Sequence, residues 1–217
     1  MNKKQMSIRV LAEVAIFAAI AFVLDLLQGG LSSVMTPFLV NGGSIGIAMV
    51  PILIISYRRG LGPGILCGLI VSLIQMLQGI YVIPGNNFEN QFMQVMGPVF
   101  QVLFDYILAY TVVGFAGIFS RMYKKSTTLK QKIVFIVLGS VLGGFLKYLC
   151  HMISGWIFWP GEMWGISGWL YSLVYNGTYC LPNIVLSTAL MVIFARFYQK
   201  FFEVEQDYKD LNKEVND

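Results

Sequence analysis

Long apolar stretches separated by short polar loops dominate the chain and predict a helical membrane protein. Most of these stretches approach the ~20 residues that an α-helix needs to span a bilayer. They fall at about 8–28, 44–57, 61–79, 97–120, 131–158 and 170–198. The second is short, and it needs residues 39–44 or a tilt to reach across the bilayer. We therefore expect an all-α integral membrane protein, a bundle of six transmembrane helices in a single domain (1–217), with a short charged tail at about 200–217.

Lys and Arg residues are confined to alternate loops, and this asymmetry predicts the orientation of the bundle. They precede the first apolar stretch, separate the second from the third and the fourth from the fifth, and follow the sixth. The three other loops, at about 29–43, 80–96 and 159–169, contain no Lys or Arg. Because short cytoplasmic loops are enriched in these residues, we expect both termini in the cytoplasm.

The composition and the missing motifs exclude several functional classes. The chain is 57% hydrophobic and 12% charged, and the predicted cytoplasmic loops account for its net charge of +4, so no nucleic-acid surface is expected. Cys67, Cys150 and Cys180 lie in apolar stretches without metal-ligand spacing, which predicts buried thiols and no disulfide. The sequence has no G-x-x-x-x-G-K-S/T loop for ATP and no catalytic or metal-binding set. We therefore expect no enzyme activity, no metal site and no cofactor.

Three ionisable residues lie deep in the predicted spans, where a charged group is costly and marks a functional candidate. From the ~1.5 Å rise per helical residue, Asp105 lies roughly 12 to 18 Å below the outer face, His151 about 12 Å and Lys147 about 18 Å. Lys147 and His151 are four residues apart and share a helix face. The group is either a ligand site or a buried Asp–Lys pair that only fixes helix packing. Glu13 and Asp25, nearer the ends of the first span, are interpreted as mostly topological.

Aromatic residues are concentrated in the last outer loop and at the start of the sixth span. All four tryptophans occur within fourteen residues, and three tyrosines and one asparagine follow directly. In chain order they are Trp156, Trp159, Trp164, Trp169, Tyr171, Tyr175, Asn176 and Tyr179. An interfacial aromatic belt explains part of this enrichment. Its concentration at one loop favours a pocket, because aromatic faces beside a carboxylate suit a flat or cationic ligand.

Small residues form a face on the first span. Ala15, Ala18 and Ala19, with Ala12 one turn earlier, would allow another helix to approach closely. The face could pack inside the bundle or meet a partner subunit, and the sequence leaves both interpretations open.

Several motifs together resemble a known family. The longest reads K-Y-L-C-H-M-I-S-G-W-I-F-W from Lys147 and continues as W-L-Y-S-L-V-Y-N-G to Gly177. Shorter pieces are V-P-I-L-I-I-S-Y-R-R-G-L-G-P-G from Val50, F-D-Y from Phe104 and A-I-F-A-A in the first span. With these motifs, which touch spans one to six, the chain resembles the thiamine-specific substrate-binding membrane subunits of energy-coupling-factor (ECF) transporters.

The resemblance implies a non-enzymatic binding subunit of six helices in the plasma membrane of a bacterium. Such a subunit captures thiamine from outside and is turned over by a separate module, which consists of a transmembrane coupling subunit and two ATPase subunits. The missing ATP-binding loop fits this division of labour. The Ala-x-x-x-Ala face of the first helix, here Ala15 and Ala19, is implied to contact the coupling subunit.

The resemblance also implies which residues bind the ligand. They are Asp105, Lys147, His151, Trp159, Tyr171, Asn176, Tyr106 and Tyr81. Asp105 and Asn176 would hold the aminopyrimidine, with Lys147 and Tyr171 beside them. The histidine and the tryptophan are associated with the rings of the ligand, and the last two tyrosines are weaker candidates for the pocket wall. A carboxylate and aromatic faces also suit the permanent charge of a thiazolium ring.

Two features differ from the family pattern and keep other functions open. Gly42 or Gly43 stands in the first outer loop, where some members place an aromatic residue over the ligand, and the stretch 83–97 is longer than expected. A different ligand of the same transport class, such as a thiamine precursor, its hydroxymethylpyrimidine half or another vitamin, is one alternative. Another is a membrane enzyme or sensor in which Asp105 and His151 act as acid and base.

Overall fold

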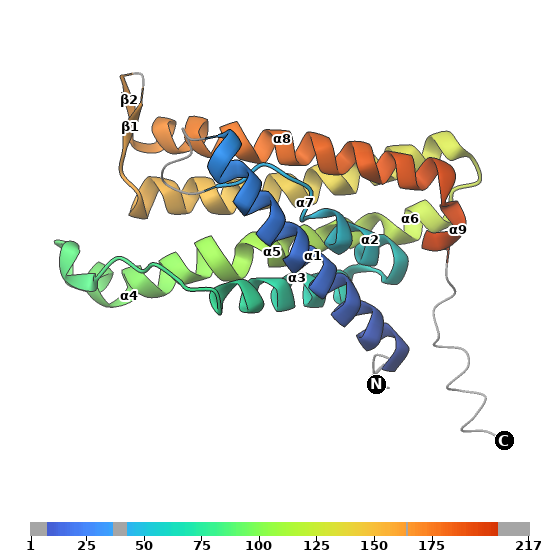
Figure 1. Cartoon of the computed structure of the whole chain (residues 1–217), viewed down its shortest axis with the longest axis horizontal. Helices are drawn as coiled ribbons and strands as arrows, with labels where there is room; N and C mark the ends of the chain where they lie inside the picture. Colours follow the sequence, from blue (N-terminus) through green and yellow to red (C-terminus); the bar gives the residue numbers. More distant parts are fainter. Residues whose placement is uncertain (1–7, 37–42, 164, 204–217) are drawn as a thin grey trace.

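The computed structural model describes residues 8–36, 43–163 and 165–203, and the chain is mostly helical in these ranges (Figure 1). The α-helices are α1 (Ile8–Met35), α2 (Val50–Arg59), α3 (Leu61–Met76), α4 (Gln91–Gln101), α5 (Ala109–Thr111), α6 (Ser120–Lys125), α7 (Leu129–Phe158), α8 (Gly168–Phe197) and α9 (Gln199–Phe202). Helical turns of other pitch are η1 (Gly85–Asn87), η2 (Val102–Leu108) and η3 (Val112–Phe119). A short antiparallel hairpin joins β1 (Glu162–Met163) to β2 (Ile166–Ser167).

Among the described residues, four helical segments are long and apolar enough to cross a membrane, which confirms the prediction of an all-α membrane protein. They are Ile8–Val34, Gln91–Lys125, Leu129–Phe158 and Gly168–Phe197. The second and third predicted spans are shorter, because α2 has 10 residues and α3 has 16. These lengths correspond to about 15 and 24 Å of helix, against a ~30 Å hydrocarbon core. The six crossings, the position of the termini and the single domain stay predictions, and residues 204–217 of the predicted tail lie outside the described residues.

The predicted fourth span is one continuous rod that changes pitch along its length. α4 contains Pro98, η2 is a π-helix and η3 is a 3₁₀-helix. Proline disrupts the regular helical hydrogen-bond ladder because it has no N–H to donate. Single turns of π-helix occur frequently at functional sites, and Asp105 and Tyr106 lie in this one. Each change of pitch also turns the following side chains about the axis, so a period of 3.6 residues does not give their direction.

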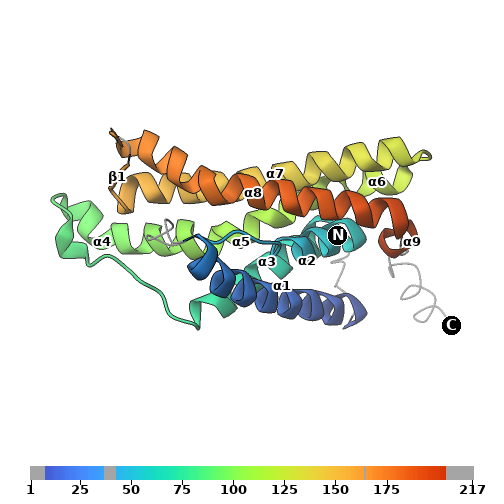
Figure 2. The same cartoon turned by 45° about the horizontal axis from the view of Figure 1, so that its top comes forward.

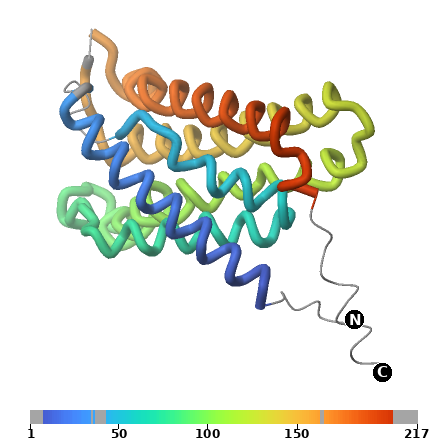
Figure 3. Tube along the Cα trace, turned by 45° about the vertical axis from the view of Figure 1, so that its right-hand side comes forward, coloured from blue at the N-terminus to red at the C-terminus, as the bar shows by residue number. Residues whose placement is uncertain are grey.

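α7 and α8 form the most extensive helix pair and run antiparallel through the bundle (Figure 2). α7 begins at a capping box in which Thr128 and Gln131 accept hydrogen bonds from each other's backbone N–H groups. α8 begins at Gly168, whose φ of +62° suits glycine. α1 instead crosses the other long helices obliquely (Figures 1 and 3).

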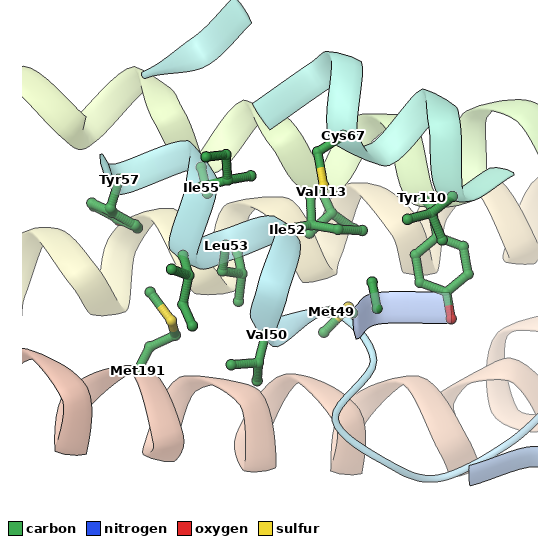
Figure 4. Close-up of a cluster of buried hydrophobic side chains, with 14 of the residues drawn as sticks. Met49, Val50, Ile52, Leu53, Ile55, Tyr57, Cys67, Tyr110, Val113 and Met191 are labelled. Atoms are coloured by element: carbon green, nitrogen blue, oxygen red, sulfur yellow. The ribbon is translucent and has the colours of Figure 1, made fainter. Parts of the chain in front are cut away.

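α2 lies at the centre of the hydrophobic core (Figure 4). Nine of its 10 residues are buried, and Ile52 and Leu53 have no exposed surface. The Tyr57 hydroxyl donates to the carbonyl oxygen of Phe135 in α7 at 2.5 Å. Gly60, with φ at +95°, lets the chain turn directly from α2 into α3. The short helix thus fills one half of the bundle and leaves the other half without a central helix.

The end of the bundle opposite the β1–β2 hairpin is rich in Arg and Lys, and we name it the basic end; the other end is the hairpin end (Figure 1). Glu13 of α1 pairs there with Arg58 at 2.8 Å and with Arg59 at 2.6 Å. Arg58 also donates to the carbonyl oxygen of Phe201 at 2.5 Å, and Lys124 donates to the carbonyl oxygen of Arg58 at 2.7 Å. Glu13, interpreted from the sequence as topological, therefore joins α1 to α2.

α3 and η3 approach each other so closely that only glycine fits between their backbones. A Cβ atom on Gly114 would lie 2.3 Å from the backbone nitrogen of Ile65 and 2.4 Å from the carbonyl carbon of Gly64. One turn further along α3, a Cβ atom on Gly68 would lie 2.3 Å from the carbonyl oxygen of Tyr110 in α5, directly before η3. Because both sides of these contacts are backbone, no change of side-chain rotamer can relieve them.

We expect Gly114→Ala to destabilise the protein by about 1–3 kcal/mol, the usual cost of overpacking a core. Gly62→Ala is the matched control on α3, because its Cβ would meet nothing within 4 Å. Thermal unfolding of both purified variants in detergent, followed by circular dichroism, should lower the midpoint for Gly114→Ala alone. Equal midpoints would contradict the close contact between α3 and η3.

Candidate functional site

A cavity of about 640 Å³ lies in the half of the bundle toward the hairpin end. Its walls come from α1, α3, η2, α5, α7 and α8, with Gly43 and Ser44 at the approach to α2. The volume is within the range of sites for small organic ligands. Seven of the eight residues predicted to bind the ligand line this cavity, namely Asp105, Tyr106, Lys147, His151, Trp159, Tyr171 and Asn176.

Asp105 enters the cavity from η2, where it is held by Trp159, the residue after α7, and lies close to His151 on α7. Trp159 Nε1 donates a hydrogen bond to Asp105 Oδ2 at 2.9 Å. His151 Nδ1 lies 3.9 Å from Asp105 Oδ1, and the two side chains are only 19% and 16% exposed. The depths counted from the sequence, which place Asp105 and His151 at a similar level, are therefore confirmed. A carboxylate fixed beside two flat rings can accept hydrogen bonds from an aromatic ligand that lies between them.

Tyr81 packs against Trp159 and does not line the cavity. The ring centroids of these two residues are 5.4 Å apart, and Tyr81 is 62% exposed. The backbone N–H of Tyr81 donates to the Tyr106 hydroxyl at 3.0 Å. Gln101 donates to the carbonyl oxygen of Tyr81 at 3.1 Å and accepts from the N–H of Ile83 at 2.9 Å. The segment around Tyr81 is thus anchored to α4 and η2, where it supports Trp159.

Asn176 is buried on α8, and its side-chain amide is fixed by neighbours on the same helix. Nδ2 donates to the carbonyl oxygen of Ser172 at 2.9 Å and to its hydroxyl at 3.0 Å, and Oδ1 accepts from the Tyr179 hydroxyl. The rings of Tyr171 and Tyr175 stack with centroids 5.6 Å apart. α8 therefore contributes a preorganised amide among aromatic faces.

Lys147 lines the same cavity as Asp105 but has a different partner. Its side chain is buried, with 6% exposed, and Nζ lies 3.5 Å from the ring centroid of Tyr110, a cation–π geometry. Asp105 is instead held by Trp159 and lies close to His151. The buried Asp105–Lys147 pair considered from the sequence is therefore wrong.

The pocket interpretation of the tryptophan cluster is right for Trp159 and wrong for two of the others. Trp156 is 53% exposed and Trp169 is 56% exposed, and neither lines the cavity. Exposed tryptophans at the ends of α7 and α8 are typical of an interfacial aromatic belt. Trp164 lies outside the described residues.

A polar wall contributed by α1, α3 and α5 was missed from the sequence. Asp25 lines the cavity, so its interpretation as a topological residue is wrong. The Tyr110 hydroxyl donates to Asp25 Oδ1 at 2.5 Å, and Gln75 donates to Oδ2. Gln28 also donates to Oδ1, at 3.2 Å. The signal in the sequence was a carboxylate and two amides inside apolar stretches, where polar groups are costly.

The segment ahead of α2 is fixed at the edge of the cavity. Asn183 of α8 donates to the carbonyl oxygen of Ser44 at 2.8 Å. Gly43 has φ at +99° and lies against Tyr179, where a Cβ would stand 2.6 Å from the ring. A glycine at this position therefore allows the segment to lie directly on an aromatic wall of the cavity. Gly42 lies outside the described residues.

The alanine face of α1 is divided between the core and the surface. Ala18 is fully buried, whereas Ala12, Ala15 and Ala19 are exposed. Internal packing therefore accounts for Ala18, and the exposed part of the face is free to meet lipid or another protein. The contact of Ala15 and Ala19 with a partner subunit stays a prediction.

These features define a class of protein. The cysteines Cys67, Cys150 and Cys180 are buried free thiols. In the ranges that the structure describes, no group of three or more His, Cys, Asp or Glu side chains could hold a metal ion. A helical membrane protein with a polar, aromatic-walled cavity of this size is a protein that binds a small solute within the membrane.

Known proteins narrow this class to one family. The family model described as thiamine transporter protein matches residues 11–203. Thiamine transporter ThiT of Bacillus subtilis (strain 168) is 34% identical over 197 residues, which cover 89% of this chain and 93% of that protein. Its namesake in Lacticaseibacillus paracasei is 27% identical over 210 residues, which cover 94% of each. The solved structure of ThiT from Listeria monocytogenes matches with a TM-score of 0.69 and 28% identity, over 89% of this chain and 96% of that chain.

The chain belongs to the thiamine transporter family. This membership confirms the family resemblance found in the sequence motifs. A transport role, as in the named relatives, also agrees with the absence of an ATP-binding loop from the sequence.

Proposed function

We propose that this chain is the thiamine-binding subunit of an ECF transporter, which captures thiamine from outside and delivers it for ATP-driven uptake. The observation that carries the proposal is the Asp105 carboxylate, held by Trp159 and close to His151 in a buried cavity. The carboxylate can accept a hydrogen bond from the exocyclic amine of the aminopyrimidine, and the amide of Asn176 can donate or accept. The flat rings suit both halves of the ligand. The thiamine transporters among its relatives support this choice of ligand.

The proposed orientation has the basic end in the cytoplasm, with six crossings and both termini inside a bacterial plasma membrane. Arg58, Arg59 and Lys124 at that end support this orientation, because cytoplasmic ends are enriched in Lys and Arg. The second crossing would combine α2 with the non-helical segment before it. Irregular backbone at membrane depth is tolerated where it lines a cavity, as Ser44 does. The cavity would then open toward the outside.

The proposed partners are a transmembrane coupling subunit and two ATPase subunits. This chain has no ATP-binding loop of its own, so the energy for release of a tightly held ligand must come from other subunits. Ala15 and Ala19, exposed on α1, would contact the coupling subunit, because small residues allow helices to approach closely. The chain itself would be non-catalytic, and the transport role of its relatives speaks against a membrane enzyme or sensor.

Tryptophan fluorescence of the purified protein tests the ligand and the site together. We expect thiamine to quench the emission saturably, because Trp159 lines the cavity. The quenching should persist in Trp156→Phe and Trp169→Phe, whose parent side chains are exposed, and should be lost in Trp159→Phe. If a thiamine precursor, or the pyrimidine half of thiamine, competed with a higher affinity than thiamine has, that compound would be the ligand instead. No saturable response in folded protein would contradict the proposal.

Trp159→Ala should weaken thiamine binding by about 1–3 kcal/mol, because it removes a ring that stacks on the ligand and a donor to Asp105. Isothermal titration calorimetry of the parent and the variant in the same detergent measures this difference. Trp156→Ala is the control, since it removes an exposed ring from α7, three residues before Trp159. An unchanged affinity in Trp159→Ala would make Trp159 an interfacial anchor only.

A further inference from the structure

The cavity has a second carboxylate that no role assigned above requires. Asp25 reaches it from α1, whereas Asp105 reaches it from η2. Asp105, Asn176 and the aromatic rings are enough to hold an aminopyrimidine. A carboxylate within a membrane protein is costly, so a second one in the same cavity needs a function of its own.

The hydrogen bonds of Asp25 come from neutral groups. Tyr110 and Gln28 donate to Oδ1, at 2.5 and 3.2 Å, and Gln75 donates to Oδ2. Such donors fix the position and direction of the carboxylate, but they leave its negative charge in place. Gln28 is itself fixed by the N–H of Ala48, which donates to its Oε1 at 3.1 Å.

The ammonium group of Lys147 does not neutralise this carboxylate by direct contact. Lys147 Nζ lies over the face of the Tyr110 ring, 3.5 Å from its centroid, while the hydroxyl of the same ring donates to Asp25. The ring thus contacts both charged groups, the ammonium through its face and the carboxylate through its hydroxyl. In the part of the chain that the structure describes, no Lys, Arg or His nitrogen forms a salt bridge with Asp25.

The count of charged groups around the cavity indicates why a second carboxylate is present. The described residues that line the cavity include two carboxylates, Asp25 and Asp105, and one ammonium group, Lys147. With a neutral His151, the walls carry one net negative charge, which a ligand with one permanent positive charge would balance. Without Asp25 the walls would carry no net charge, and a cation would keep only the attraction of the aromatic faces as an advantage over an uncharged molecule of the same shape.

We propose that Asp25 is the counter-ion for the permanent positive charge of the ligand, and that it makes the cavity selective for an organic monocation over its uncharged isostere. This inference rests on the proposed function, since thiamine is the cation that it places beside Asp25. Asp105 would position the aminopyrimidine, and Asp25 would recognise the charge of the thiazolium ring.

The test compares two ligands on the purified full chain. One is thiamine, and the other is its uncharged thiophene isostere, in which carbon replaces the ring nitrogen. Asp25→Asn keeps the size and one acceptor oxygen of the side chain but removes its charge. We expect Asp25→Asn to weaken thiamine binding by about ten- to hundredfold, because one charge–charge interaction in a partly solvated site is lost. The affinity of this variant for the isostere should change less than about twofold.

Two further variants separate charge from structure. Tyr110→Phe removes one hydrogen bond to Asp25 and keeps the carboxylate, so the ratio of the two affinities should stay within about threefold of the parent ratio. Asp105→Asn should weaken both ligands, because both carry the aminopyrimidine.

Each contrary result has a distinct meaning. If Asp25→Asn weakened both ligands equally, the charge role would be overturned and Asp25 would be a structural residue. The same conclusion would follow if Tyr110→Phe lowered the ratio of thiamine affinity to isostere affinity as far as Asp25→Asn does. Unchanged thiamine affinity in Asp25→Asn would overturn it as well. A folded parent protein that binds neither ligand would overturn the proposed function itself.

Discussion

Replacing Asp105 by alanine should abolish measurable high-affinity thiamine binding, with a loss of about 3–5 kcal/mol. The carboxylate is mostly buried, accepts a hydrogen bond from Trp159 at 2.9 Å and lies 3.9 Å from His151. Truncating one member of a buried, charged hydrogen-bonded set is costly because the remaining donors lose their partner. The aminopyrimidine would lose its acceptor at the same time. Calorimetric titration of the parent and the variant gives the difference directly.

The control for this loss is a second acidic residue toward the same end of the molecule. Glu89 is exposed in the segment between η1 and α4, and Glu89→Ala should leave the affinity for thiamine within about twofold of the parent value. Asp105→Asn should bind more tightly than Asp105→Ala, because the amide oxygen can still accept from Trp159. If Asp105→Ala kept full affinity, the ligand would lie elsewhere.

The double variant Ala15→Leu, Ala19→Leu should abolish thiamine uptake by cells and leave binding to the purified protein unchanged. Both alanines are exposed on α1, so leucine can be accommodated in the isolated chain without a clash in the core. A helix that packs closely on this face would be displaced, because small residues are what permit such an approach. Accumulation of labelled thiamine measures uptake, and the fluorescence titration measures binding.

Added bulk elsewhere on the surface should have no such effect. Val185 is 66% exposed on α8, and Val185→Leu adds volume at a position facing away from the core. This variant should transport at the parent rate. Weaker binding in the alanine double variant would show that the face packs against its own bundle, and unimpaired uptake would exclude it as the coupling surface.

The parts of the site that could be predicted from sequence are those that depend on depth along a helix. Lys147 and His151 share a face through their spacing of four residues, and the counted rise places Asp105 at the level of His151. Both relations are local or follow from the span boundaries. They hold in the structure, where all three residues line one cavity.

The direction of a side chain about its helix axis could not be predicted in the same way. The π-helical stretch of η2 begins only three residues before Asp105, and its altered pitch turns Asp105 relative to Tyr110. Lys147 therefore meets Tyr110 and not Asp105. Asp25 was missed for a related reason: the oblique path of α1 brings it against α3 and α5, and packing angles between helices are not encoded in the pattern of one segment.

The composition of the tryptophan-rich stretch does not predict which tryptophan lines the cavity. Four tryptophans in one short stretch indicate an interface or a pocket, and of the three that the structure describes, Trp159 is the one whose indole N–H donates to Asp105. Trp156 and Trp169 have the same chemistry, but they lie at exposed positions of their helices.

The shortness of α2 gives the two halves of the molecule different tasks. Its 10 residues are about three helical turns shorter than a full membrane crossing, and the cavity lies beside the segment that precedes it. A bound ligand would therefore fill the interior of the half that contains the cavity. The tightly packed core around Ile52 and Leu53 stabilises the other half. Substitutions that reshape the cavity need not disturb that core. A bundle built in this way can change its ligand during evolution while its hydrophobic core stays the same.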